Sequence, residues 1–70
     1  MIESFEVIIK EFATQAVIER DTENSHVCVT WYNLVDGKKE FREKNCNEKM
    51  SHEDFIKFKN QMKCYHQIIE

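Results

Sequence analysis

The only glycine of the chain, Gly37, directly follows Asp36, and this dipeptide separates two segments with β-strand character. Asp-Gly is a strong signal for a two-residue type I′ hairpin turn, because glycine adopts positive φ without steric cost and aspartate tolerates it. We therefore expect a hairpin between residues 26–35 and 38–44. The expected cross-strand pairs are Val35 with Lys38, Tyr32 with Phe41, and Trp31 with Arg42, the last as a cation–π contact.

The two strands of this hairpin differ in how apolar they are. Residues 26–35 carry apolar side chains on both faces of a strand, whereas Phe41 is the only apolar residue of 38–44. A strand that is apolar on both faces is typical of the middle of a sheet, and a charged strand is typical of its edge. The sheet therefore needs a third strand on the other side of residues 26–35.

The third strand has to come from residues 4–20, which fit two structures. As one long strand with a bulge near Lys10 and Glu11, the segment gathers most of its apolar side chains on one face. As a helix, it leaves several of them outside the apolar face. The strand explains more residues, and residues 21–24 would then form the turn into the hairpin. The resulting neighbours are Ile18 and Ala16 beside Val27 and Val29.

A helix is predicted over residues 52–69. Ser51, with Asp54 three residues later, forms a capping-box pattern, and acidic residues in the first turn suit the helix dipole. The apolar residues that follow recur at spacings of three and four and share one helical face: Phe55, Phe58, Met62, Tyr65 and Ile69. Together the elements predict a single α+β domain over residues 1–70, a small antiparallel β-meander of about three strands with the C-terminal helix packed on one face.

One helix can cover only one face of such a sheet. We expect it to cover the face that carries Ile18, Val27, Val29 and Trp31. The other face would then expose an apolar patch that monomers rarely leave uncovered, which predicts a homodimer or a protein partner. The residues of this patch are Tyr32, Leu34 and Phe41, with Ile8 and Val17 beside them.

Three cysteines and three histidines raise the question of a metal site. The most suggestive set is His26, Cys28, Cys64 and His66. No cysteine pair has the short spacing of zinc sites, and positions 64 and 66 point to different sides of a helix. We expect no metal or other cofactor, with Cys28 in the core and Cys46 projecting from the opposite face of the hairpin. An odd cysteine count, no leader segment and no membrane-spanning apolar run predict reduced thiols in the cytoplasm and no membrane partner.

No arrangement typical of catalysis stands out in the sequence. Nucleophilic catalysis needs an activated nucleophile beside an oxyanion hole, and the chain has neither a glycine-rich loop nor a cysteine at the predicted helix start. The adjacent carboxylates of Glu53 and Asp54 are explained by helix capping. The net charge of −3 is neither that of a bulk nucleic-acid binder nor that of a DNA mimic. We therefore do not expect an enzyme.

The remaining features favour binding. Eight lysines against two arginines, with no proline and one glycine, are typical of an AT-rich gene such as those of low-GC bacteria and their phages. We interpret the chain as a non-enzymatic protein-binding regulator or inhibitor, encoded by a phage or mobile element and directed at a host protein. The alternative is a small nucleic-acid-binding module that uses the hairpin. The candidate partner-binding residues are Tyr32, Leu34, Phe41, Lys39, Arg42, Glu11 and Glu19.

Overall fold

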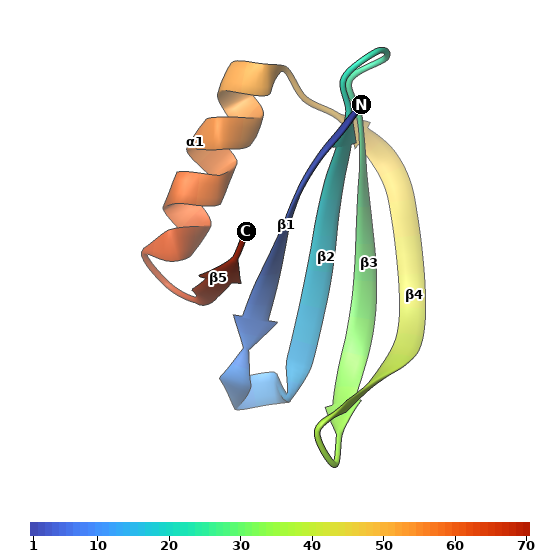
Figure 1. Cartoon of the computed structure of the whole chain (residues 1–70), viewed down its shortest axis with the longest axis vertical. Helices are drawn as coiled ribbons and strands as arrows, with labels where there is room; N and C mark the ends of the chain where they lie inside the picture. The colour runs from blue at the N-terminus through green and yellow to red at the C-terminus, as the bar shows by residue number, and fades with distance from the viewer.

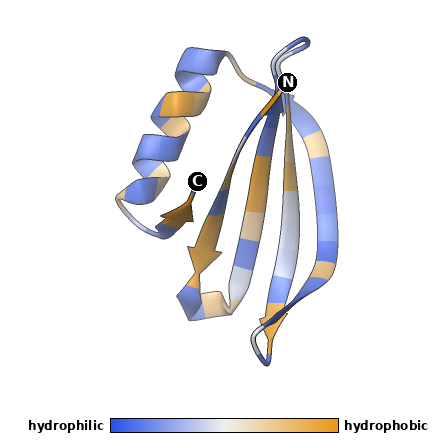
Figure 2. Cartoon of the chain, viewed as in Figure 1, coloured by the Kyte–Doolittle hydropathy of each residue, from blue (hydrophilic) through white to orange (hydrophobic).

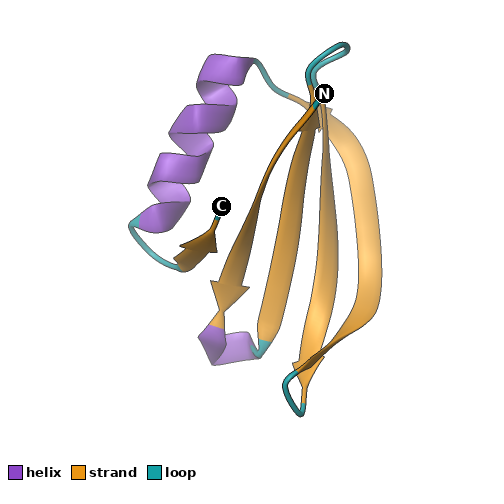
Figure 3. Cartoon of the chain, viewed as in Figure 1, coloured by secondary structure: helices purple, strands orange, loops and turns teal.

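Five strands form one antiparallel sheet with the spatial order β4-β3-β2-β1-β5, and one α-helix lies beside it (Figure 1). The computed structural model describes residues 1–70. The predicted α+β class is confirmed, but the sheet has five strands where about three were expected (Figure 3). The elements are β1 (Ile2–Ile9), β2 (Thr14–Asp21), β3 (His26–Val35), β4 (Lys38–Lys49), α1 (His52–Lys63) and β5 (Gln67–Ile69).

Residues 4–20 belong to two strands, so the single bulged strand and the helix are both wrong. The chain reverses through η1 (Lys10–Phe12), a single 3₁₀ turn, and Ala13, which has a left-handed φ of 47°. β1 and β2 then pair along their whole length. The reversal begins where the bulge was expected. The alternation of apolar residues does not distinguish a bulge from a turn, because both can leave the same side chains on one face.

The turn between β2 and β3 lies at residues 22–25, one residue later than predicted. Ile18 lies opposite Val29, and Ala16 lies opposite Trp31, which is two residues along from the expected register. A shift of two keeps every side chain on its predicted face, because side chains alternate with a period of two. The predicted face is therefore right although the predicted register is wrong.

The hairpin turn is confirmed at Asp36 and Gly37. Both residues have positive φ, 51° and 77°, as a type I′ turn requires. β4 continues to Lys49, five residues beyond the predicted end at residue 44. Next to the turn, the observed register contains two of the three predicted pairs, Val35 with Lys38 and Tyr32 with Phe41.

Register shifts interrupt the pairing of β3 with β4 further along. The first lies between Trp31 and Tyr32, and it sets Trp31 opposite Glu43 and not opposite Arg42 as predicted. The extra residue in β4 is typical of a β-bulge. The cation–π contact is nevertheless confirmed, because the Arg42 guanidinium lies over the Trp31 ring, 5.4 Å from its centroid.

Cys28 of β3 and Cys46 of β4 form a disulfide. In an uninterrupted register the two side chains would project from opposite faces of the hairpin. The bulge adds one residue to β4 and brings the two Cα atoms to 4.1 Å from each other. The predicted core role of Cys28 and the three reduced thiols are therefore wrong, and only Cys64 is free. The cytoplasmic location stays a prediction.

We expect one titratable thiol, that of Cys64, in the folded non-reduced protein. The disulfide joins residues 18 positions apart. Removing it in a Cys28→Ser/Cys46→Ser variant should lower the free energy of unfolding by about 2 kcal/mol, because the cross-link restricts the unfolded chain. Thiol titration with and without reductant, followed by urea unfolding, measures both effects. Three reactive thiols in the folded, non-reduced chain would contradict the disulfide.

The helix begins as predicted and ends earlier. The Ser51 hydroxyl accepts a hydrogen bond from the Asp54 backbone N–H at 3.1 Å, which is the predicted cap. α1 ends at Lys63, and Gln67–Ile69 pair with β1 as β5. Strand pairing there covers the free edge of β1, which one more helical turn would leave unpaired. The helix is too short and too polar to cross a bilayer.

The core lies between α1 and one face of the sheet, as predicted. Phe5 of β1 contacts Phe55 and Phe58 of α1, with ring centroids 5.4 and 6.0 Å apart. Tyr65 and Ile69, predicted on the apolar face of the helix, are instead 74% and 41% exposed. Figure 2 shows hydrophobic residues concentrated on β1 and β2, whereas β4 is largely hydrophilic. The buried core residues are Phe5, Val7, Ala16, Ile18, Val27 and Phe55, with Val29 and Trp31 packed against them.

Candidate functional site

No element covers the face of the sheet that is turned away from α1 (Figure 1). Its side chains occupy the alternate positions of β1, β2, β3 and β4 that do not point into the core. The surface combines apolar side chains with charges of both signs. We call it the open face and define it by Glu6, Ile8, Gln15, Val17, Glu19, Thr30, Tyr32, Leu34, Lys39, Phe41 and Lys44.

Two aromatic rings form the centre of the open face. Tyr32 and Phe41 pack edge to face, with ring centroids 6.3 Å apart and planes at 79°. Phe41 is 66% exposed, whereas Tyr32 and the neighbouring Leu34 are half-buried. Because β3 is a central strand, the Tyr32 ring is held on a rigid support. The pair offers an aromatic anchor of the kind that dominates many protein interfaces.

A polar bridge crosses the open face beside these rings. The Lys39 ammonium lies 5.2 Å from the centroid of the Tyr32 ring and 3.5 Å from a Glu6 carboxylate oxygen. The Gln15 side-chain amide donates a hydrogen bond of 2.7 Å to the same Glu6 oxygen. Lys39 belongs to β4 and Glu6 to β1, so the lysine side chain extends over β3 and β2 to reach its partner. The bridge neutralises one charge of each sign on this surface.

The structure gathers five of the seven predicted binding residues on the open face and separates two from it. Arg42 is displaced by the bulge and stacks on Trp31 on the opposite face. Glu11 lies in the η1 turn at the end of the sheet. The two predicted acidic binding residues, Glu11 and Glu19, therefore lie apart, one in a turn and one on the sheet. The five residues on the open face are Tyr32, Leu34, Phe41, Lys39 and Glu19.

The sequence prediction missed Glu6 and Gln15 as parts of this surface. Their positions follow from alternation along β1 and β2, where Val7 and Ala16 point into the core. That signal becomes usable only when the turn after Ile9 is known, because the turn decides which residues of the two strands lie side by side.

The four residues of the suggested metal set do not come together. Cys28 is bonded to Cys46, and His26 lies at the start of β3 near the beginning of α1. Cys64 and His66 follow the other end of α1, about 18 Å away along a helix of 12 residues. A shallow hollow of about 180 Å³ beside the disulfide is lined by Ile2, Glu19, Asp21, His26, Cys28 and Lys44.

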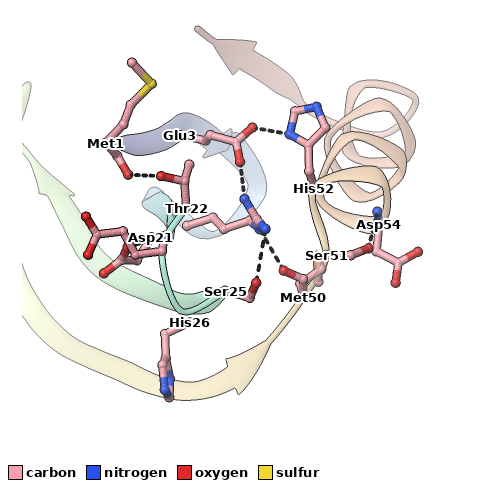
Figure 4. Close-up of polar contacts among 12 residues, drawn as sticks. Met1, Glu3, Asp21, Thr22, Ser25, His26, Met50, Ser51, His52 and Asp54 are labelled. Atoms are coloured by element: carbon pink, nitrogen blue, oxygen red, sulfur yellow. Dashed lines mark hydrogen bonds and ion pairs between the residues drawn. The ribbon is translucent and has the colours of Figure 1, made fainter.

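A second polar cluster ties the sheet to the start of α1 (Figure 4). The Arg20 side chain is only 7% exposed. Its guanidinium donates to the Met50 carbonyl at 2.7 Å and pairs with the Glu3 carboxylate. It also donates to the Ser25 hydroxyl at 3.2 Å. His52 Nδ1 lies 2.6 Å from the other Glu3 oxygen. The cluster therefore joins β1, β2, the β2–β3 turn and α1 through one buried cation.

The pKa of Glu3 is shifted by this environment. Partial burial by itself would raise the pKa, but the hydrogen bonds from Arg20 and His52 and their positive charges lower it below the usual value of 4.5. A carboxyl whose pKa is lower in the folded state contributes stability above the unfolded pKa. That contribution is lost as the pH falls through the folded pKa.

We expect Glu3 to steepen the acid destabilisation of the chain below about pH 4.5. In a Glu3→Gln variant, the melting temperature should fall less between pH 5 and pH 3 than in the wild type, because one proton-linked interaction is gone. Thermal unfolding followed by circular dichroism measures this slope. Glu48→Gln, an exposed position on β4 without an ion-pair partner, is the matched control. Equal slopes in wild type and Glu3→Gln would contradict the assignment.

The chemistry that the open face offers is that of a contact surface. Aromatic and aliphatic carbon lies in its middle, and carboxylates, an amide and ammonium groups surround it. Protein interfaces have this arrangement of an apolar centre with a polar rim.

Comparisons with protein-family models, with curated proteins and with solved structures found no match to this chain.

Proposed function

We propose that this chain is a non-enzymatic protein-binding regulator whose contact surface is the open face. The observation that carries the proposal is the one-sided packing of the sheet. α1 covers the face of Phe5, Val7 and Ile18, while the opposite face holds Tyr32 and Phe41 with no element over them. An apolar surface with a polar rim on a rigid sheet is typical of a site for another protein.

The sequence composition supports a specific setting for this regulator. The lysine-rich, proline-free composition is typical of an AT-rich genome, and small binding domains that act by occupying a surface need no catalytic machinery. We therefore propose an inhibitor encoded by a phage or mobile element that acts on a host protein. The target would place an apolar side chain against the Phe41 ring, which is 66% exposed.

A nucleic-acid-binding module is the second candidate, because Lys39 and Lys44 flank the aromatic pair on the same face. Aromatic rings between lysines suit stacked bases and phosphates. Glu6 and Glu19 share this face, however, and Lys39 is already paired with Glu6. With Arg42 stacked on the other face of the sheet, the positive charge that remains on the open face is small. These features favour a protein over a nucleic acid.

A capture experiment with a matched pair of variants tests the proposal. The tagged chain is incubated with lysate of the source organism, with and without nuclease, beside Phe41→Ser and Phe12→Ser. Both phenylalanines are exposed, 66% and 77%, but Phe12 lies in the η1 turn and not on a strand of the sheet. We expect one protein to be retained after nuclease treatment by the wild type and by Phe12→Ser, and to be lost with Phe41→Ser.

Two results would overturn the proposal. Retention that disappears on nuclease treatment and falls steeply with salt would favour the nucleic-acid module. Equal retention by Phe41→Ser and the wild type would show that the target binds elsewhere on the molecule. Circular dichroism of both variants confirms that loss of binding does not come from loss of the fold.

A further inference from the structure

We propose that a second copy of this chain covers the open face when no target is bound, related to the first copy by a two-fold axis parallel to the strands. The inference rests on the proposed function, because it takes the open face to be a contact surface. It adds what occupies that surface in the free protein. The order of charges across the strands, the row-by-row match of side chains and the size of the face support it.

Opposite charges lie on opposite sides of the open face. Glu6 and Glu19 belong to β1 and β2, whereas Lys39 and Lys44 belong to β4, on the far side of β3. Lys39 reaches across to Glu6. Lys44 and Glu19 have no ion-pair partner within the chain. The face therefore has a basic side on β4, where Lys44 lacks an ion-pair partner, and an acidic side on β1 and β2.

Of the two orientations that keep the strands of both copies aligned, one matches these charges. Two identical sheets can face each other about a two-fold axis that lies between them, either across the strands or along them. An axis across the strands places β4 on β4 and sets lysines against lysines. An axis along the strands, midway between β2 and β3, places β1 of each copy on β4 of the other. The second arrangement pairs acidic with basic sides, and complementary charges of this kind fix the register of an interface.

The strand register makes the match specific. Residues paired across the four strands form rows of side chains. A rotation about an axis along the strands does not change the position of a row along the strand direction, so each row faces the same row of the other copy. In the first row, Glu6 on β1 lies opposite the partner's Lys44. In the second row, Ile8 lies opposite the partner's Phe41, which covers that exposed ring. The rows are Glu6, Val17, Thr30 and Lys44, and Ile8, Gln15, Tyr32 and Phe41.

The size of the open face fits a reversible dimer. Four strands about 4.8 Å apart and about eight residues long span roughly 500 Å² on each copy, or roughly 1,000 Å² for the pair. Specific interfaces begin at about this size and the stable ones are larger, so self-association should be weak, in the micromolar range. A target that contacts more than the flat face can then displace the second copy. Self-association would regulate how much of the open face is available.

Charge reversal tests the arrangement, because the two-fold axis repeats each contact. Lys44→Glu places glutamate opposite Glu6, and Glu6→Lys places lysine opposite Lys44. Sedimentation velocity over a range of concentrations should show self-association weakened at least tenfold in each variant. An equimolar mixture of the two variants should associate again, because in the mixed pair both contacts join opposite charges. Lys57→Glu, an exposed lysine on α1, is the control for a change in net charge and should behave as the wild type.

The mixture result decides the proposal. If the variants do not recover association when mixed, or if each associates as strongly as the wild type, the strand-parallel dimer is wrong. Glu6→Lys also removes the partner of Lys39 within the chain. Circular dichroism therefore checks that this variant is folded. Lys44→Glu breaks no ion pair within the chain, so its effect on association is independent of such a change.

The same samples separate this proposal from the proposed function. A chain that is monomeric at all concentrations but loses its captured target on Phe41→Ser would overturn the dimer and leave the regulator. A chain that forms the predicted dimer but captures no protein would support the dimer and overturn the regulator.

Discussion

Replacing Phe5 by alanine is expected to remove about a third or more of the free energy of unfolding at 25 °C. Phe5 is 1% exposed and contacts both Phe55 and Phe58, so its ring joins β1 to α1. Truncating a buried phenylalanine costs about 3–5 kcal/mol, since it removes apolar contacts and leaves a cavity. A domain of this length has a total stability of only about 4–10 kcal/mol. One side chain therefore supplies a large part of the free energy of unfolding.

Urea unfolding monitored by circular dichroism measures this effect, with Phe41→Ala as the control. Both residues are phenylalanines in β-strands, but Phe41 is 66% exposed. The control should change the free energy of unfolding by less than about 1 kcal/mol. A Phe5→Ala variant with a stability within about 1 kcal/mol of the wild type would show that α1 does not depend on this contact.

Replacing Arg20 by alanine is expected to cost about 3 kcal/mol, because it leaves buried groups without their partner. Its side chain is 7% exposed and joins the Glu3 carboxylate, the Met50 carbonyl and the Ser25 hydroxyl. The carbonyl loses a charge-assisted hydrogen bond, and the carboxylate retains only His52. The start of α1 should become mobile, since Met50 directly precedes its cap.

The free energy of unfolding of Arg20→Ala should be compared with that of Arg42→Ala. The Arg42 side chain is 42% exposed. It makes a cation–π contact with Trp31, a 3.4 Å hydrogen bond to Asn33 and a 4.0 Å ion pair with Glu43. Because these contacts are exposed, its loss should cost less than about 1 kcal/mol. Arg20→Lys separates charge from geometry, because an ammonium does not reproduce the fork of a guanidinium. If Arg20→Lys is as stable as the wild type, the shape of the arginine is not what the cluster requires.

Local signals in the sequence were sufficient for the parts of the fold that depend on neighbouring residues. Asp36 and Gly37 specify their turn through their own φ preferences. Ser51 and Asp54 specify the helix start through one hydrogen bond. The face of the sheet that α1 covers follows from the alternation of Ile18, Val27 and the residues around them. A register error of two residues does not change this face, because side chains alternate with a period of two.

The parts that the sequence did not predict depend on contacts between distant segments. β5 forms because Ile68 pairs with the open edge of β1. The helical periodicity of the sequence does not show that this strand pairing competes with a longer helix. The Cys28–Cys46 disulfide and the displacement of Arg42 both follow from a one-residue bulge in β4, where alternating charged residues leave the register weakly specified. No local signal distinguishes Arg20 from other strand residues, because its partners Glu3 and Met50 lie 17 and 30 positions away in the sequence.

The pairing of β5 with β1 has a consequence for the chain during its synthesis. Val7 is made early, but its strand partner Ile68 follows about sixty residues later. Until β5 has left the ribosome, the outer edge of β1 presents unpaired backbone groups beside apolar side chains, which is the kind of surface that recruits other chains. The interval between the synthesis of β1 and that of β5 therefore contributes to the time for which a nascent chain is exposed to aggregation.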